Sequence, residues 1–150
     1  MAQTLVCLRV HVVFSAKDRR PMITPEIEPE LYAYLGGVMR NLESPCLAAG
    51  GTSNHVHLLV SQSKKIALCD LMEEIKKSSS KWIKTKGADL RTFGWQDGYG
   101  AFTIGQSQVE ALQQYIARQK ERHNKQTFEE ELIMLLKKYH VPYDERYIWS

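Results

Sequence analysis

The sequence has few cysteines, and none of them form a closely spaced pair. Its 150 residues include only Cys7, Cys46 and Cys69. An odd number of widely spaced cysteines argues against a disulfide framework and against a cysteine zinc site. We therefore expect three free thiols in a reducing compartment.

Long apolar runs and nucleotide-binding loops are also absent. No segment approaches the ~20 consecutive apolar residues that a membrane-spanning helix needs. The first residues show neither a charged start before an apolar run nor a small-residue cleavage site. No G-x-x-x-x-G-K pattern predicts a phosphate-binding loop. These absences favour a soluble cytoplasmic protein without a membrane partner or a nucleotide cofactor.

No charge of one sign dominates the chain. The formal net charge is +3, which permits a nucleic-acid partner without requiring one. A length of 150 residues with 43% hydrophobic residues fits one domain with its own core. We expect this domain to span residues 1–150, with a core at about 5–123 and a C-terminal helix and tail at about 127–150.

The order of patterned segments predicts an α+β fold. Alternating apolar residues or short apolar runs between turn residues predict strands at 6–14, 46–49, 55–61 and 101–104. Apolar residues at helical spacing predict helices at 25–44, 67–86, 107–123 and 127–141, three of them opened by Thr24-Pro25 or by capping boxes at Ser107 and Thr127. The first six elements predict a ferredoxin-like β-α-β-β-α-β sheet. Its first and third strands should be central and antiparallel, and helices should leave one face of the sheet available.

A pair of histidines stands in the third predicted strand, in His55-Val56-His57. Side chains alternate along a strand, so both imidazoles point to the same face, about 6.6 Å apart at Cα. Neutral imidazole is a common metal ligand near pH 7, so the two rings can converge on one ion. Two histidines on a half-exposed strand face without any metal are the alternative interpretation.

The predicted helix from Ser107 carries Tyr115, Gln119 and His123 at four-residue steps. Residues at this spacing share one stripe of a helix. The stripe lies beside the apolar face of the same helix rather than on it. Such residues can reach over a sheet and still meet a substrate, although a boundary tyrosine with a solvated glutamine is the alternative.

Several segments in this order carry a family resemblance. They are H-V-V-F at 11–14 with basic residues after it, N-H-V-H-L-L-V at 54–60, G-Y-G-A-F at 98–102, Y-I-A-R-Q-K at 115–120, and the tail from Phe128 through Y-D-E-R-Y at 143–147. The chain resembles the single-tyrosine HUH transposases of small bacterial insertion sequences over nearly its whole length. No single segment is specific, but their joint order is.

The resemblance implies a role for each matching residue. Tyr115 matches the catalytic tyrosine, carried on the additional C-terminal helices, and His55, His57 and Gln119 match the ligands of Mg²⁺ or Mn²⁺. Members are similar in cleaving and rejoining single-stranded DNA through a 5′-phosphotyrosine, as homodimers that recognise hairpins near the element ends. In some members the tyrosine helix of one subunit completes the histidine site of the other. Asn54 departs from the Asp that many relatives have, which we expect to alter the surroundings of the ligands only.

Basic and aromatic residues add candidate DNA contacts. Lys17, Arg19 and Arg20 form a basic loop, and Arg118, Lys120 and Arg122 flank the proposed site. Trp95 and Tyr99 are predicted to stack on bases. A lysine stripe at 77, 81 and 84 is equally typical of a solvated helix face. We expect His11 to be packed beside the histidine strand and His123 to end its helix, outside the site.

Other tyrosines compete with Tyr115 for the role of nucleophile. Tyr139 follows a leucine stripe and is predicted to be part of the core. Tyr143 and Tyr147 lie in the tail and have no ligand-type residue four positions later. We therefore favour Tyr115.

The main alternative function is a non-catalytic or domesticated single-stranded nucleic-acid-binding protein. Binding alone would survive chelation of metal and loss of Tyr115. It would not require the set of Tyr115, Gln119, His55 and His57, so the enzyme is the favoured interpretation.

Overall fold

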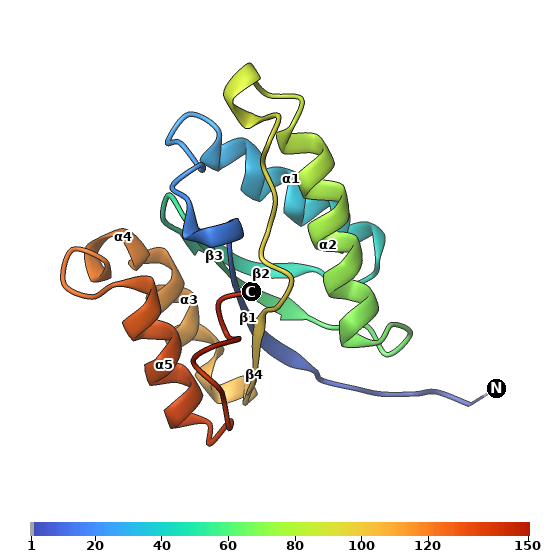
Figure 1. The fold of residues 1–150 in the computed structure, drawn as a ribbon. Coiled ribbons are helices and arrows are strands. Elements are labelled where there is room, and N and C mark those ends of the chain that lie inside the picture. Colours follow the sequence, from blue (N-terminus) through green and yellow to red (C-terminus); the bar gives the residue numbers. More distant parts are fainter. Residues whose placement is uncertain (1) are drawn as a thin grey trace.

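One antiparallel sheet organises residues 2–150, which are the residues that the computed structural model describes. Its strand order is β2-β3-β1-β4, so the first and third strands are central and pair with each other (Figure 1). The elements are β1 (Arg9–Ser15), α1 (Glu28–Asn41), β2 (Cys46–Gly51), β3 (His55–Ser61), α2 (Leu68–Ile83), β4 (Gly100–Ile104), α3 (Val109–Ala117), α4 (Gln119–Arg122) and α5 (Phe128–Lys138). This mixed architecture confirms the predicted fold class.

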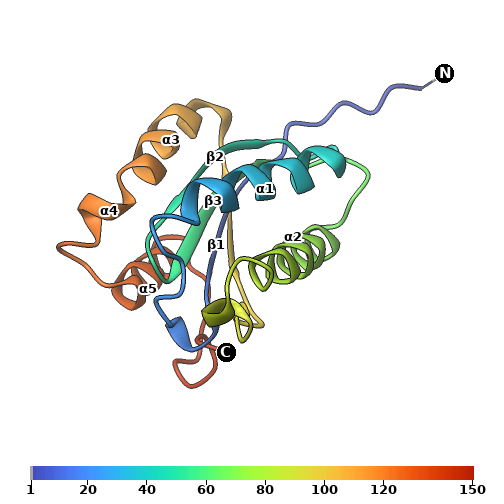
Figure 2. The same ribbon diagram turned by 90° about the horizontal axis from the view of Figure 1, so that it is seen from above.

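Helices α1 and α2 cover one face of the sheet and build the larger core (Figure 2). Val12 and Phe14 of β1 point to this face and are fully buried. They pack in one cluster with Leu35 of α1 and Ile75 of α2. The cluster is continuous because each helix turns an apolar stripe toward the alternating apolar residues of the strands.

The opposite face of the sheet is not available, contrary to the prediction. Helices α3, α4 and α5 lie over it (Figure 2). Val13 and Phe102 pack against Phe128 and Leu135 of α5, and Leu59 packs against α3. The strands present apolar residues on this face as well, and the C-terminal helices have apolar stripes of their own to bury. Polar side chains on the same face are therefore enclosed rather than solvated.

Strand β1 begins at Arg9, three residues later than predicted. Arg9 pairs with Ser61 at the end of β3 and with Ile104 at the end of β4. In residues 2–8 the Leu8 carbonyl accepts the Gln62 N–H, but this part of the chain forms no strand ladder. Leu5 and Val6 are consequently exposed, at 83% and 48%.

Helix boundaries differ from the predictions at two places. Helix α1 begins at Glu28 rather than at Pro25, after a turn in which the Thr24 carbonyl accepts the Glu28 N–H. The segment from Ser107 is not one helix opened by a capping box. A 3-10 turn precedes Val109, no side chain caps the helix, and the chain breaks at Arg118 before α4. The capping box of Thr127 and Glu130 is present and opens α5 as predicted.

A glycine brings α3 close to the sheet. A Cβ atom at Gly50 would lie 2.4 Å from the carbonyl oxygen of Ile116, a separation that real Cβ atoms do not show. Gly50 also stands opposite His57 in the ladder between β2 and β3. Only glycine therefore lets α3 approach β2 at the position beside His57, and Tyr115 precedes the contacted residue.

The cysteines and the lengths of the helices can be compared with the predictions. Cys7, Cys46 and Cys69 are all free thiols. Within residues 2–150, the helices fall short of the length and apolarity needed to cross a membrane.

Candidate functional site

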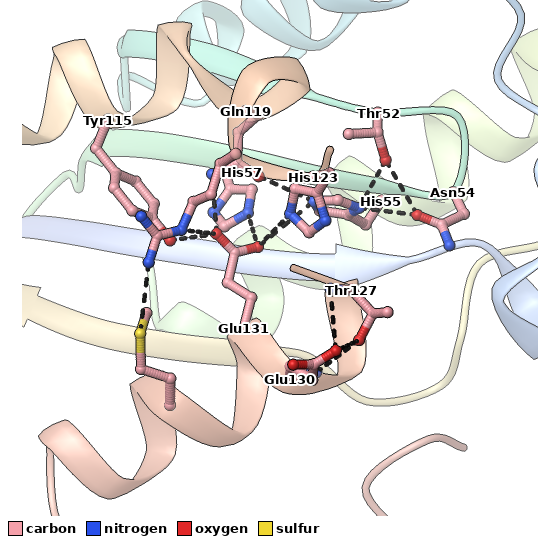
Figure 3. A network of polar contacts seen from close by, with 12 residues as sticks. Thr52, Asn54, His55, His57, Tyr115, Gln119, His123, Thr127, Glu130 and Glu131 are labelled. Atoms are coloured by element: carbon pink, nitrogen blue, oxygen red, sulfur yellow. Dashed lines mark hydrogen bonds and ion pairs between the residues drawn. The ribbon is translucent and has the colours of Figure 1, made fainter. Parts of the chain in front are cut away.

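A cluster of polar side chains is enclosed between the sheet and the C-terminal helices. His55 and His57 point from β3 to the same face, as the strand period predicted (Figure 3). Glu131 reaches them from α5, and His123 follows α4. The His55, His57 and Glu131 side chains are 0% exposed, and the His123 side chain is 11% exposed.

Glu131 is the centre of the cluster. Its Oε1 atom lies 3.0 Å from His57 Nε2 and 2.9 Å from His123 Nε2. Its Oε2 atom accepts hydrogen bonds from the Gln119 amide at 3.0 Å and from the Tyr115 hydroxyl. The predicted nucleophile and the predicted ligands thus meet at one carboxylate that the sequence analysis did not include.

The position of Glu131 follows from the stripe of α5. Phe128, Leu132 and Leu135 are buried along this helix, and Glu131 is on the same stripe, three residues after Phe128. A carboxylate is almost never fully buried without partners. A glutamate on an otherwise apolar stripe was therefore the sequence signal that could have identified this residue.

His123 was expected to lie outside the site, and the structure places it inside. The break at Arg118 changes the direction of the chain, so α4 is not a continuation of α3. Gln119, predicted to sit beside the buried face, is consequently 1% exposed, and its Oε1 atom lies 3.1 Å from His55 Nε2. The structure brings Tyr115, Gln119 and His123 to one carboxylate, but they do not share a continuous helical stripe.

The outer nitrogens of the two strand histidines have partners of their own. His55 Nδ1 lies 2.9 Å from Asn54 Oδ1 and 2.9 Å from the Thr52 hydroxyl oxygen. His57 Nδ1 lies 2.8 Å from His11 Nε2, so His11 contacts the site instead of only packing beside it. The Nε2 atoms face the acceptor oxygens of Gln119 and Glu131, so each ring donates from Nε2 in the metal-free protein. In the tautomers that carry the proton on Nδ1, the Nε2 lone pairs would be presented to a metal ion instead.

The environment favours neutral imidazoles. Burial, followed by the nearby His57 ring, lowers the pKa of His55 to about 3 and that of His11 to about 3. Both rings are therefore unprotonated at neutral pH. Neutral rings offer the lone pairs that a metal ion requires.

Glu131 and Tyr115 are shifted in opposite directions. Burial by itself would raise the pKa of the Glu131 carboxyl, but hydrogen bonds from His123, His57 and Tyr115 hold it well below its usual range. Burial raises the pKa of Tyr115, and its hydrogen bond to Glu131 raises it further. The carboxylate is thus charged, whereas the phenol keeps its proton until a cation or another group changes these surroundings.

The donor atoms fit a single metal ion. One atom each from His55, His57, His123 and Glu131 all lie within 4.8 Å of one another. In an octahedral shell with bonds of ~2.1 Å, neighbouring donors are about 3 Å apart and opposite donors about 4.2 Å apart. Glu131 Oε1 lies 2.9–3.6 Å from the Nε2 atoms of the three histidines, which is close to the spacing of neighbouring donors.

Acidification is expected to destabilise the metal-free protein. In the unfolded chain the His55 and His11 rings bind protons below about pH 6.5, whereas the folded rings stay neutral until about pH 3. The stability that they contribute at neutral pH is therefore lost as the pH falls from about 6.5 toward 3, by up to ~1.4 kcal/mol per pH unit for each ring. Urea unfolding in EDTA at pH 7, 6 and 5 measures this loss.

His11→Gln provides the matched comparison for this pH dependence. It removes one of the two depressed rings, so the free energy of unfolding should fall less steeply with decreasing pH than in the unchanged protein. Equal stability at pH 7 and pH 5 in the unchanged protein would contradict the assignment of neutral buried rings.

Two clefts adjoin Tyr115 on its outer side. One has a volume of about 580 Å³ and contains the cations Arg118, Arg122 and Lys125. The other, of about 380 Å³, lies between α3 and α5 and is lined by His11, Tyr139 and Lys138, among others. The Arg122 guanidinium stands 4.8 Å from the centre of the Tyr115 ring and borders both clefts. Two of the predicted DNA-contacting residues thus lie beside the tyrosine.

The remaining predicted DNA-contacting residues are farther out. Lys120 pairs with Glu28 across a third cleft, at 2.9 Å. Arg19 pairs with Glu129 at 3.0 Å and lies 5.0 Å from the Trp149 ring, so the C-terminal tail and α5 hold its side chain. Lys17 and Arg20 are exposed on the loop next to Arg19.

Trp95 is not available for stacking on bases. It is 7% exposed, donates its indole N–H to the Ser79 hydroxyl at 2.9 Å, and packs edge-on against Phe14 and Phe93. Its size and apolar surface make it part of the larger core. Tyr99 is 37% exposed and lies 5.3 Å from the Lys76 ammonium.

The competing tyrosines lie away from the carboxylate. Tyr139 is half-buried and stacks on Phe102 with 4.9 Å between ring centres. Tyr147 is 65% exposed in the tail. Among the tyrosine hydroxyls in residues 2–150, that of Tyr115 is the one that hydrogen-bonds to Glu131.

The chain is similar to known transposases. The model of the family described as "Transposase IS200 like" matches residues 4–119, which leaves His123 and Glu131 outside the match. A candidate transposase from Deinococcus radiodurans R1 has a similar structure, with a TM-score of 0.63 and 19% identity over 79% of this chain and 95% of that one. A REP-associated tyrosine transposase bound to a REP hairpin has a TM-score of 0.61 and 15% identity over 82% of this chain and 73% of that one. No curated protein matches the chain significantly.

Proposed function

The chain belongs to the IS200-like transposase family, and from this premise we propose that it cleaves and rejoins single-stranded DNA through a 5′-phosphotyrosine on Tyr115. The observation that carries the proposal is the hydrogen bond from the Tyr115 hydroxyl to Glu131 inside a group of histidines. A nucleophile and a set of metal-binding side chains are thereby within reach of one phosphate.

His55, His57 and Glu131 would hold a divalent metal ion, with His123 and Gln119 beside them as further donors. The Gln119 ligand implied by the family resemblance stays within this set. When bound, such an ion polarises a phosphate and stabilises the charge that develops during its cleavage. His11, Asn54 and Thr52 would fix the orientation of the two strand histidines.

The donor set favours Mn²⁺ over Mg²⁺. Mg²⁺ prefers oxygen ligands and keeps several waters, whereas a divalent transition metal such as Mn²⁺ also accepts imidazole nitrogen, although more weakly than the later metals of its row. Three imidazoles and one carboxylate are available here. We propose Mn²⁺ as the ion that binds more tightly, with Mg²⁺ as the weaker alternative.

Tyr115 must lose its proton to attack. Its pKa is raised in the present surroundings, and Glu131 Oε2 is the atom that already accepts the phenol hydrogen. We propose that the proton leaves along this hydrogen bond while the phenol oxygen forms a bond to phosphorus. The bond from phosphorus to the upstream 3′-oxygen breaks and that oxygen takes up a proton from water, while Glu131, a weak base, passes the phenol proton on to solvent. The exchange conserves one phosphodiester bond, so a second DNA end can reverse it.

DNA hairpins are the proposed substrate. The REP-associated tyrosine transposase of similar fold is bound to a REP hairpin, and here the cations Arg118, Arg122 and Lys125 share one cleft beside Tyr115. Phosphate contacts of this kind position nucleic acid without reading its sequence.

We further propose that the working unit is a homodimer, as the family resemblance implies.

Covalent capture tests the proposed function. The protein is mixed with single-stranded DNA from the flanks of its gene in Mn²⁺, and protein–DNA adducts are separated on a denaturing gel. We expect an adduct that EDTA prevents and that excess Mn²⁺ restores. Tight binding without an adduct on every flanking sequence would favour the non-catalytic binding protein instead.

A further inference from the structure

A third cleft lies at the end of the cluster that faces away from Tyr115. It has a volume of about 530 Å³ and opens between the turn that joins β2 to β3 and the segment that joins α4 to α5. Asn54, His123, Asn124 and Lys120 are among the residues that line it.

The side chains of the site form a row between Tyr115 and this cleft. In Figure 3, Tyr115 lies at one end, His57 and Glu131 are in the middle, and His55, His123 and Asn54 follow toward the other end. The ring contacts have the same order, because Tyr115 neighbours His57, His57 neighbours His55, and His55 neighbours His123. The third cleft therefore begins where the row ends.

The direction of attack relates this row to the polarity of the DNA. In phosphoryl transfer the attacking and leaving oxygens are roughly in line on opposite sides of phosphorus. Formation of a 5′-phosphotyrosine makes a bond between the Tyr115 oxygen and phosphorus and breaks the bond to the 3′-oxygen of the upstream nucleotide. The side chains in the middle of the row are enclosed in the metal-free protein, so a phosphate reaches them only when the site opens. A phosphate that is then attacked by Tyr115 releases its 3′-oxygen on the side away from Tyr115.

We infer that the third cleft binds the nucleotide whose 3′-hydroxyl is released, the one immediately 5′ of the cleaved phosphate. This inference rests on the proposed function and adds the strand polarity across the site. The downstream nucleotide stays attached through its 5′-oxygen, which occupies a lateral position on phosphorus and is not directed into this cleft.

The lining of the cleft suits a nucleotide. The Lys120 side chain is 65% exposed and pairs with Glu28, a carboxylate that a phosphate would have to displace; Glu129 also lines the cleft. The amides of Asn54 and Asn124 offer donors and acceptors to a base or sugar. Phe128 lines the cleft with apolar surface and stacks on His55, with 4.6 Å between ring centres. Holding the released end here would keep its hydroxyl next to the phosphotyrosine for rejoining.

The test fills the third cleft with a larger side chain and asks whether DNA with a smaller nucleotide at the corresponding position restores adduct formation. Asn124 is exposed, so Asn124→Trp fills the cleft from its rim without a change in the core. We expect adduct formation with Mn²⁺ to slow by about 10-fold or more, comparable to the loss of one stacked base. An abasic residue immediately 5′ of the cleaved phosphate should recover most of this loss, measured against the unchanged protein on the same abasic DNA.

Gln114→Trp is the matched control, because Gln114 is also exposed but lines the cleft on the Tyr115 side. The 5′ abasic residue should not rescue this variant. Ser53→Trp fills the third cleft from its other rim. It is used in place of Asn124→Trp if the Asn124→Trp protein melts at a lower temperature than the unchanged protein.

The outcomes separate this inference from the proposed function. Rescue of Asn124→Trp by an abasic residue on the 3′ side, or unchanged adduct formation by both cleft-filling variants, would overturn the inferred polarity while the nicking activity stands. Absence of any adduct from the unchanged protein would overturn the proposed function itself. Rescue from the 5′ side alone supports both.

Discussion

Tyr115→Phe is expected to abolish the covalent adduct. The substitution removes the phenol oxygen that attacks phosphorus and leaves the ring, including its contact with the Arg122 guanidinium at 4.8 Å. Loss of a nucleophile of this kind lowers the rate by about 10⁵-fold or more. Binding of single-stranded DNA should stay within about 3-fold, because phosphate contacts supply most of the affinity. Denaturing gels measure the adduct, and fluorescence anisotropy measures binding.

Tyr139→Phe is the matched control for this substitution. Tyr139 is also half-buried, lines a cleft that Tyr115 borders, and stacks on Phe102. Its hydroxyl has no hydrogen bond to Glu131. Removing that hydroxyl should leave adduct formation nearly unchanged. If the Tyr115→Phe protein still forms the adduct at the original rate, the nucleophile must be another tyrosine, such as Tyr143 or Tyr147.

Glu131→Gln is expected to have the second large effect, on metal binding. The substitution keeps the size of the side chain but removes the charge that His57, His123 and Tyr115 surround. Loss of even an outer partner of a metal site lowers affinity by about 10–100-fold, and a direct ligand should cost at least as much. Titration calorimetry with Mn²⁺ measures the change in Kd. Adduct formation at a fixed Mn²⁺ concentration should fall in parallel.

Glu130→Gln is the control for this variant. Glu130 is the adjacent residue on α5, is exposed, and accepts hydrogen bonds from Thr127 in the capping box. Glutamine at this position can make the same capping box, so the helix should be preserved. If Glu131→Gln binds Mn²⁺ normally and Gln119→Ala does not, the ligand set implied by the family resemblance would replace the one centred on Glu131.

The strand that carries the histidine pair could be predicted in detail from the sequence. Its predicted bounds, 55–61, are those of β3. The two-residue period of a strand is a local property, so it alone determines that His55 and His57 face the same side. The capping box of α5 is also local, since Thr127 and Glu130 bond each other's backbone. Local chemistry likewise gave the class of the fold, because alternation and helical spacing define the order of strands and helices.

Other features depend on packing between distant segments. Arg118 interrupts the predicted helix, and no proline or glycine marks that break. The second face of the sheet was expected to be available, yet α3 and α5 bury it with residues far along the chain. Periodicity shows that a helix has an apolar stripe but not which surface the stripe covers.

The sequence alone thus determined the fold class, the shared face of His55 and His57 and the selection of Tyr115 and Gln119 as candidates. Only the tertiary structure decided that Glu131 stands at the centre of the site and that His123 joins it. Glu131 is 74 residues from His57 in the chain, and no local pattern relates them. Burial made the difference, because a carboxylate enclosed on an apolar helix stripe needs hydrogen-bond partners. Glu131 finds them on β3 and on the segment from α3 to the end of α4.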